Sequence, residues 1–286
     1  MTSEITEAMQ LIISEGKEAE EAISKELSKQ ITFVIHVLGT IRVTLNEYGP
    51  SMPTDTACSA VALFLFSKIV RTGRAIKELA GAGYGVEADV LVRAALEAFI
   101  NLRFIVAKGC EERAQLYIEF EHVLAHHYLQ RVDRWQELFK GLDLVPRRHE
   151  IEEQFQRVKG NYPDPNFWAA KVIRRGRLRS MAEEVGLKWY YDFIYWFGSN
   201  QSHSNARSAN EYMDVSKDGK IIYKLGPSGQ YRQVLPPLSL TADLLIKALK
   251  AIVSLFNLPA EYTIKELEEG YTATFGDVEA KRGKEV

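Results

Sequence analysis

The chain has 286 residues, of which 46% are hydrophobic and 26% are charged, and its formal net charge is −2. This length and hydrophobic content allow a substantial buried core and exclude an intrinsically disordered chain. The near-neutral charge also argues against a nucleic-acid coat protein, which would carry a large excess of basic residues.

The features that report on compartment favour the cytoplasm. Cys58 and Cys110 are too few and too far apart for a disulfide framework or a zinc motif, so a reducing cytosol is the expected environment. The first residues, MTSEITEAMQ, lack the basic region and apolar block of a secretory signal. The longest apolar run, AVALFLF at 60–66, is far shorter than the ~20 residues that span a bilayer. We therefore expect a cytoplasmic protein without a membrane partner.

Apolar residues spaced by three or four predict one long amphipathic helix over residues 1–48, which begins at Thr2 or Ser3 and ends at YGPSMP. The stripe consists of Ile5, Met9, Ile12, Ala19, Ile23, Leu27, Ile31, Val34, Leu38, Ile41 and Leu45. Its four-residue steps from Ala19 to Ile31 depart from a strict heptad and favour packing along a bundle over a regular two-stranded coiled coil. Gly16 makes the first half the weaker part.

Residues 54–210 predict a core bundle that contains the candidate site. Thr54 or Asp55 can cap a helix that runs to about Gly81, and the sequence GAGYG separates it from the next helix. Further helices are expected over residues 86–108, 111–139, 146–159 and 178–186, followed by an aromatic helix that begins near residue 189.

Residues 211–236 predict a β-hairpin excursion, because two turn dipeptides flank short β-prone pieces: Asp218-Gly219 and Ser228-Gly229. A Pro-Pro pair then precedes an apolar helix, and C-terminal helices are expected over residues 237–275. The whole chain, 1–286, is predicted to be a single all-α domain: a multi-helix bundle with a long N-terminal helix and a small β-hairpin insertion.

The helix predicted over residues 86–108 contains a polar row in which Arg93, Glu97 and Asn101 follow one another at intervals of four. Apolar residues surround this row, so its polar groups must be paired or solvated. Two interpretations stay open. The row is either an intrahelical Arg–Glu pair at the bundle edge, or an anion-binding fork in which Glu97 orients the guanidinium of Arg93.

Residues 199–210, SNQSHSNARSAN, concentrate short hydrogen-bonding side chains directly after the aromatic run WYYDFIYWFG. Helical spacing puts Tyr191, Tyr195, Ser199 and His203 on one stripe, and a histidine at its polar end can act as an acid or base near neutral pH. The alternative is a helix end at which these side chains cap backbone groups. The residues that could bind a substrate are Asn101, Ser199, Asn200, Ser202 and Arg207.

The stretch EFEHVLAHHY contains one E-x-x-H step, from Glu119 to His122, with His126 one turn later. Di-iron bundles use this step twice, with further carboxylates. The single copy here favours a histidine cluster without a metal, and the chain also lacks the common nucleotide-binding motifs. No metal and no cofactor are predicted.

The basic stretch KVIRRGRLR at 171–179 has five cations in nine residues. Such a stretch favours a solvated face. Contact with a phosphate backbone, beside Phe167 and Trp168, is the alternative.

Two segments resemble a bacterial family that is catalogued only as a domain of unknown function. They are RTGRAIKELAGAGYGVEADVLVRAALEAFINLRFI and the later aromatic helix that ends in SNQSHSN. The resemblance covers residues 60–210 and implies an all-α fold in which Arg93 and Glu97 act together with His203. It implies no particular reaction.

More distantly, an α-helical bundle with an Arg/His site is similar to the HEPN superfamily. Many of its members are metal-independent ribonucleases in toxin–antitoxin and phage-defence systems. The superfamily's signature, Arg followed by four to six residues and then His, is missing, because the corresponding positions hold Trp196, Phe197 and Gly198. The resemblance implies RNA as the partner, with His203 as general acid or base and Arg93 stabilising the phosphorane charge while Glu97 holds it.

A different class of function stays open beside RNA cleavage. The same polar residues could bind a small anion or a partner's chain end without catalysing a reaction. In that case the predicted helix over residues 1–48 would mediate homo-oligomerisation.

Overall fold

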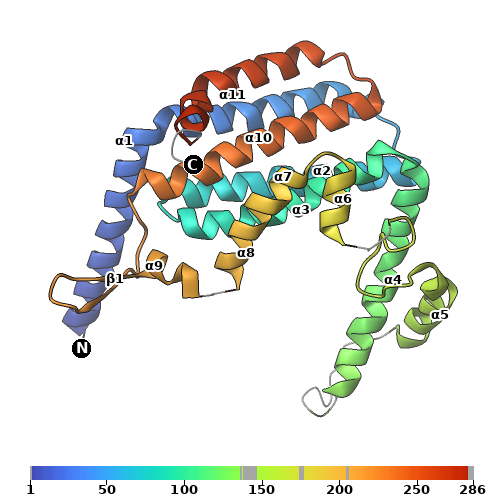
Figure 1. The fold of residues 1–286 in the computed structure, drawn as a ribbon, viewed down its shortest axis with the longest axis horizontal. Helices are drawn as coiled ribbons and strands as arrows, with labels where there is room; N and C mark the ends of the chain where they lie inside the picture. Colours follow the sequence, from blue (N-terminus) through green and yellow to red (C-terminus); the bar gives the residue numbers. More distant parts are fainter. Residues whose placement is uncertain (1, 136, 138–146, 174–176, 204–205, 283–286) are drawn as a thin grey trace. The chain divides into compact units, whose positions relative to one another are not determined.

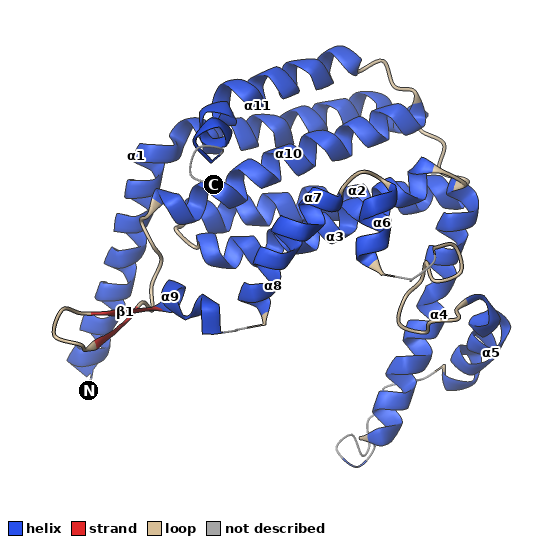
Figure 2. Ribbon diagram, viewed as in Figure 1, coloured by secondary structure: helices blue, strands red, loops and turns tan. Residues whose placement is uncertain are grey.

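The computed structural model describes residues 2–135, 137, 147–173, 177–203 and 206–282, and helices dominate it (Figures 1 and 2). The prediction of an all-α fold with a long N-terminal helix and one small hairpin is confirmed. Within the described residues, no helix is both long and apolar enough to cross a bilayer.

The chain divides into two compact units. The first comprises Met1–Met52, Leu65–Phe99 and Trp189–Val286, and the second comprises Pro53–Phe64 and Ile100–Lys188. This division does not test the expectation of a single domain, which stays a prediction.

The first unit is built on α1 (Thr2–Tyr48), α10 (Tyr231–Phe256) and α11 (Glu261–Arg282), which pack against one another (Figure 1). Helix α1 ends at Tyr48, within the predicted stop YGPSMP, and the short 3₁₀ helix η1 (Gly49–Ser51) follows it. Phe33 of α1 meets Phe275 of α11 edge to face at 6.0 Å, and Lys29 donates a 2.8 Å hydrogen bond to the Ala273 carbonyl. Phe275 is fully buried, and burying a side chain of this size contributes about 1.5–3 kcal/mol, so these contacts hold α11 against α1.

The two halves of α1 differ in burial. Ile23, Val34 and Ile41 are fully buried, whereas Ile5 and Ile12 are 55% and 68% exposed. The helix departs from regular geometry at Leu27, with φ −120° and ψ 18°. This break lies in the stretch where the apolar residues repeat every four positions. An apolar stripe with that spacing drifts around a straight helix, and a break in the helix corrects the drift.

The predicted start of α10 is wrong. We expected the apolar helix to begin after Pro236 and Pro237, but it begins at Tyr231 and contains both prolines. The two rings deprive only the Arg232 and Gln233 carbonyls of a helical donor, and buried neighbours such as Val234 and Leu238 hold this turn in place.

The β-hairpin is confirmed in a shorter form. Strand β1 (Met213–Val215) pairs antiparallel with β2 (Ile221–Tyr223), and Asp214 faces Ile222 across the ladder. The turn carries Gly219 at φ +80°, as the Asp-Gly dipeptide predicts. The hairpin follows η5 (Ala206–Ser208) and α9 (Ala209–Tyr212).

Two long helices connect the units in sequence, α2 (Ala57–Gly81) and α3 (Gly85–Ala107). The predicted cap of α2 is wrong, because Thr56 takes the place that we assigned to Thr54 or Asp55. Its side-chain oxygen accepts a 3.1 Å hydrogen bond from the Ser59 N–H. Thr56 immediately precedes the first helical residue and is therefore the residue that can reach the free N–H groups.

The second unit holds α4 (Cys110–Arg134), α5 (Arg148–Val158), η3 (Lys159–Asn161) and α6 (Leu178–Glu184). Helix α4 ends before the expected residue 139, and the predicted start at Pro146 lies outside the described residues. Trp168 and Tyr162 are buried in this unit, and Trp168 lies edge to face with Phe104 and Tyr117. Trp168 is therefore a core residue and not a stacking surface for nucleic acid.

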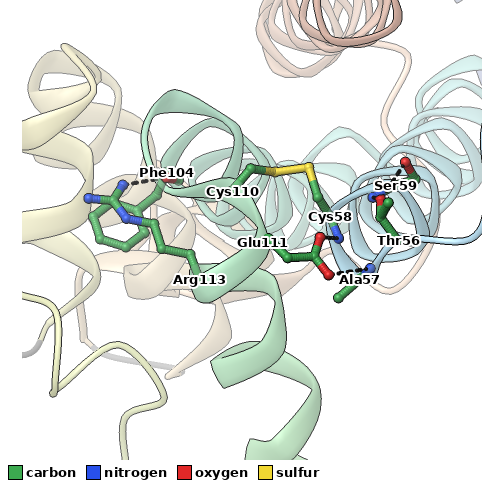
Figure 3. Close-up of a disulfide and its surroundings, with 8 residues drawn as sticks. All are labelled: Thr56, Ala57, Cys58, Ser59, Phe104, Cys110, Glu111 and Arg113. Carbon is green, nitrogen blue, oxygen red and sulfur yellow. Dashed lines mark hydrogen bonds between the residues drawn. A yellow bond between two sulfur atoms is a disulfide. The ribbon is translucent and has the colours of Figure 1, made fainter.

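The expectation about the cysteines is also wrong. Cys58 and Cys110 form a disulfide with their Cα atoms 5.4 Å apart, although 52 residues separate them in sequence (Figure 3). Sequence separation is a poor guide here, because the helical hairpin of α2 and α3 returns the chain to the start of α2.

Candidate functional site

The candidate site lies in the first unit, between α3 and the segment of residues 189–202. This segment consists of the end of α7 (Lys188–Tyr190), a π-helical turn η4 (Tyr191–Tyr195) and α8 (Trp196–Ser202). A π-helical turn widens the helix by one residue and is frequent at functional sites.

Arg93 of α3 is the centre of the site. Its Nε donates to Glu97 at 3.2 Å, one terminal nitrogen donates to Ser202 at 2.6 Å, and the other donates to Tyr195 at 3.0 Å. The guanidinium also lies over the Tyr195 ring, 4.5 Å from its centroid. Three groups therefore hold the guanidinium in one orientation. The Arg93 side chain is 19% exposed to solvent.

Gly198 allows α8 to approach α3 this closely. A Cβ at this position would lie 2.8 Å from the Arg93 Cβ and 3.0 Å from the Asp89 carbonyl oxygen. Only glycine fits such an approach without a shift of the backbone. The sequence marks Gly198 as a departure from the HEPN signature but gives no sign of this contact.

The structure brings the two predicted halves of the site together at Ser202. Its hydroxyl accepts the hydrogen bond from Arg93 and donates to the Ser199 carbonyl at 3.2 Å. His203 follows directly at the end of α8, and its side chain is exposed. Its backbone N–H donates a 3.0 Å hydrogen bond to the Ser199 carbonyl. In sequence, His203 is therefore the residue next to Ser202, whose hydroxyl binds the guanidinium.

Other residues near this helix end have local roles or fall outside the described atoms. The Ser199 hydroxyl bonds to the Tyr195 carbonyl at 2.7 Å, which is the capping role of our alternative interpretation. The side chains of Asn200 and Arg207 lie outside the described residues. Gln201, which sequence analysis passed over, has a buried Oε1 with no hydrogen-bond partner among the described residues.

Asn101 has a different environment from Arg93. Its side-chain oxygen accepts a 2.7 Å hydrogen bond from the indole N–H of Trp168, inside the second unit. This bond joins α3 to the loop after η3 and gives Asn101 a packing role. We therefore leave Asn101 out of the proposed site.

Of the three histidines of α4, His126 contacts α5. His126 stacks on Phe155 with 3.8 Å between ring centroids, and its Nδ1 lies 3.1 Å from a Glu152 oxygen, an ion-pair distance without hydrogen-bond alignment. Glu119 instead accepts hydrogen bonds from Gln115 and Asn161. Across the described ranges, no three His, Cys, Asp or Glu side chains are placed to share a metal ion.

A second polar network, which the sequence did not reveal, joins residue 190 to α10. The Tyr190 hydroxyl donates to Asp243 at 2.5 Å, and the Lys247 ammonium bonds to both of these side chains. The charge of Lys247 is neutralised by Asp243, which lies four residues earlier in α10. We therefore assign this network a structural role.

A hollow of about 720 Å³ lies elsewhere in the first unit, between the start of α1, the start of α3 and the hairpin. Its charged side chains are mostly acidic: Glu15, Glu18, Glu87, Glu211 and Lys224. Burial, and then the nearby carboxylates of Glu87 and Glu211, raise the pKa of Tyr212 at its wall. This negative field disfavours a phosphate, and Arg93 is not among the lining residues.

Fold and site together define an all-helical protein whose two distant segments meet at an oriented guanidinium. The chain belongs to a family described as "Family of unknown function (DUF5677)", whose model matches residues 59–221. This match includes both α3 and the segment that ends at His203. No curated protein and no solved structure matches the chain.

Proposed function

We propose that the protein is a metal-independent, RNA-cleaving effector of the kind found in bacterial toxin–antitoxin and phage-defence systems. The observation that carries this proposal is the 2.6 Å bond between Arg93 and Ser202, because it places the guanidinium beside the segment that ends at His203. The resemblance to HEPN-superfamily ribonucleases supports the choice of RNA. An RNA substrate places the protein's action in the cytoplasm.

Each residue has a separate role in the proposed reaction. The Arg93 fork stabilises the charge that builds up on the phosphorane, and Glu97 and Tyr195 keep the fork oriented before substrate binds. The exposed imidazole of His203 is the general acid or base, since an imidazole can both accept and donate a proton in such a reaction. Ser202 positions the guanidinium through its hydrogen bond with Arg93.

The test is incubation of the purified protein with total RNA, with and without EDTA. We expect cleavage by the wild type under both conditions, because the proposed mechanism uses no metal. His203→Ala should reduce the rate by roughly 10²- to 10⁴-fold, which is the usual contribution of one acid–base group. Arg93→Lys should also lose most activity, since lysine keeps the charge but not the planar fork.

His149→Ala is the matched control. His149 lies on α5 with 89% of its side chain exposed, and its only described partner is Glu153 of the same helix. This variant should keep the wild-type rate. Equal RNA degradation by the wild type and His203→Ala would show that the activity belongs to a contaminant and would end the proposal.

A second candidate is a non-catalytic module that binds an anion or a partner's chain end. Two observations favour it. Protein groups already occupy three of the guanidinium's donors, as in a structural arginine. The exposed apolar residues at the start of α1 also offer a contact surface for a second copy of the chain.

A further inference from the structure

The disulfide joins the starts of two helices. Cys58 is the second residue of α2 and Cys110 is the first residue of α4 (Figure 3). Both residues are half-buried, so neither lies in the closed core. The sequence contains no third cysteine, and therefore any exchange within the chain must return to the same pair.

The helix positions favour reactive sulfur. The N-terminus of a helix carries a partial positive charge, which stabilises a thiolate and lowers the pKa of a cysteine there. A stabilised thiolate is also the better leaving group when another thiol attacks the bond. Both cysteines have such a position. The Glu111 carboxylate, however, already accepts the N–H groups of Ala57 and Cys58. Glu112 adds a second negative charge in the first turn of α4, so these carboxylates offset part of the stabilisation.

Non-covalent contacts hold the two helix starts together independently of the sulfurs. The Glu111 carboxylate accepts hydrogen bonds from the backbone N–H groups of Ala57 and Cys58, both at 3.0 Å (Figure 3). Arg113, one turn into α4, donates to the Phe104 carbonyl and bonds to Glu184, which fixes the start of α4 against α3 and α6. The second unit can therefore keep its two cysteines close after the bond is reduced.

We propose that Cys58 and Cys110 form a reversible thiol–disulfide redox site whose reductant is a small thiol of the glutathione class. A reductant thiolate attacks one Sγ, forms a mixed disulfide and releases the other cysteine as a thiolate. A second reductant thiolate then attacks the reductant sulfur of the mixed disulfide and frees the first cysteine. In total, two electrons and two protons enter the protein, and two thiols of the reductant become one disulfide.

The test is titration of the folded full-length protein with buffers of varied reduced-to-oxidised glutathione ratio, followed by alkylation and intact-mass measurement. We expect both thiols to become alkylated together across the series, and the bond to re-form when the ratio is reversed. The helical circular dichroism should stay unchanged throughout. Amide exchange at residues 57–59 and 110–113 should rise several-fold on reduction.

Three results would overturn the proposal. The first is a bond that resists reduction until the protein is unfolded in guanidinium. The second is a pair of thiols that stays fully alkylated after incubation with oxidised glutathione. The third is loss of the helical signal on reduction, which would make the bond a structural requirement.

Glu111→Ala tests the part that holds the thiols together. Without the carboxylate the start of α2 is free to move, so the effective concentration of one thiol at the other drops. The disulfide-to-dithiol ratio at a fixed glutathione ratio should then fall on the order of tenfold. Glu112→Ala is the matched control in the same helical turn and should leave the ratio unchanged. An equal shift in both variants would refute the role of Glu111.

Discussion

At the scale of single residues, the site depends on how closely two backbones approach one another. Arg93 is held by Glu97 of the same helix, by Tyr195 of η4 and by Ser202 of α8, and the last two bonds require the segment 191–202 to lie against α3. Gly198 makes that approach possible because it has no side chain. The geometry of the guanidinium is therefore sensitive to a single methyl group at this position.

Gly198→Ala should destabilise the protein by about 1–3 kcal/mol, the usual cost of forcing extra volume into a packed contact. It should also disturb the Arg93–Ser202 bond and lower any RNA-cleaving activity. Urea unfolding monitored by circular dichroism measures the first effect. Gly39→Ala is the control, because a Cβ there meets nothing within 4 Å and should raise stability by roughly 0.5–1 kcal/mol in a helix interior.

Tyr162 shows how burial at one residue produces a pH effect. Its hydroxyl donates to the Leu116 carbonyl at 2.8 Å, and burial, with a smaller effect of the Glu119 carboxylate, raises its pKa above the ordinary 10.0. A raised pKa means that the folded state binds the phenol proton more tightly than the unfolded state. The resulting stabilisation is complete below about pH 10 and is lost as the pH rises from there towards the folded-state pKa.

Tyr162→Phe should therefore cost about 1 kcal/mol near pH 8, the usual net value of one buried hydrogen bond. The difference in unfolding free energy between wild type and variant should shrink above pH 10, where the unfolded wild type ionises. Urea titrations at several pH values check this sign. A difference that grows above pH 10 would contradict the assigned cause of the pKa shift.

At the scale of the elements, Arg113 fastens the start of α4. Its side chain is 8% exposed, lies over the Phe104 ring at 3.7 Å, and donates to the Phe104 carbonyl as well as to Glu184. One residue therefore connects α3, α4 and α6 within the second unit. In the sequence, Arg113 is one of many charged residues on a helix, and no local pattern marks it as buried.

Arg113→Met should destabilise the second unit by about 2–3 kcal/mol. The apolar stem can still pack, but the Phe104 carbonyl loses its donor and the half-exposed Glu184 loses its partner. Arg179→Met is the control, since the Arg179–Glu183 pair on α6 is exposed and such pairs contribute at most about 1 kcal/mol. Equal losses of stability in the two variants would contradict the role that we assign to Arg113.

At the scale of the whole molecule, the start of α1 bears on the oligomeric state. Ile5, Met9 and Ile12 follow one another at helical spacing and are all more than half exposed, whereas Ala19 is buried. Only the residues before Gly16 can therefore be removed without opening the core. A deletion of the entire first helix, which the sequence alone would suggest, would remove buried residues as well.

If the apolar start of α1 joins two copies of the chain, deletion of residues 2–15 should reduce the mass measured by light scattering to that of a monomer. Helix content per residue should stay the same, because the large apolar side chains of the deleted stretch, such as Ile5 and Ile12, are exposed. The full-length chain measured at the same concentration is the control. An unchanged mass would remove the assembly part of the second candidate function.

The sequence by itself determined the helical class, the approximate bounds of most helices, the hairpin turn and the two segments that carry Arg93 and His203. These features depend on local periodicity, turn residues and helix-ending residues, which act within a few positions of the chain. Tertiary structure decided the partners. It joined Cys58 to Cys110, buried Trp168 against Asn101, kept a Pro-Pro pair inside α10, and placed Gly198 and Ser202 on Arg93. Such contacts join residues far apart in sequence, and the packing that creates them leaves no local pattern.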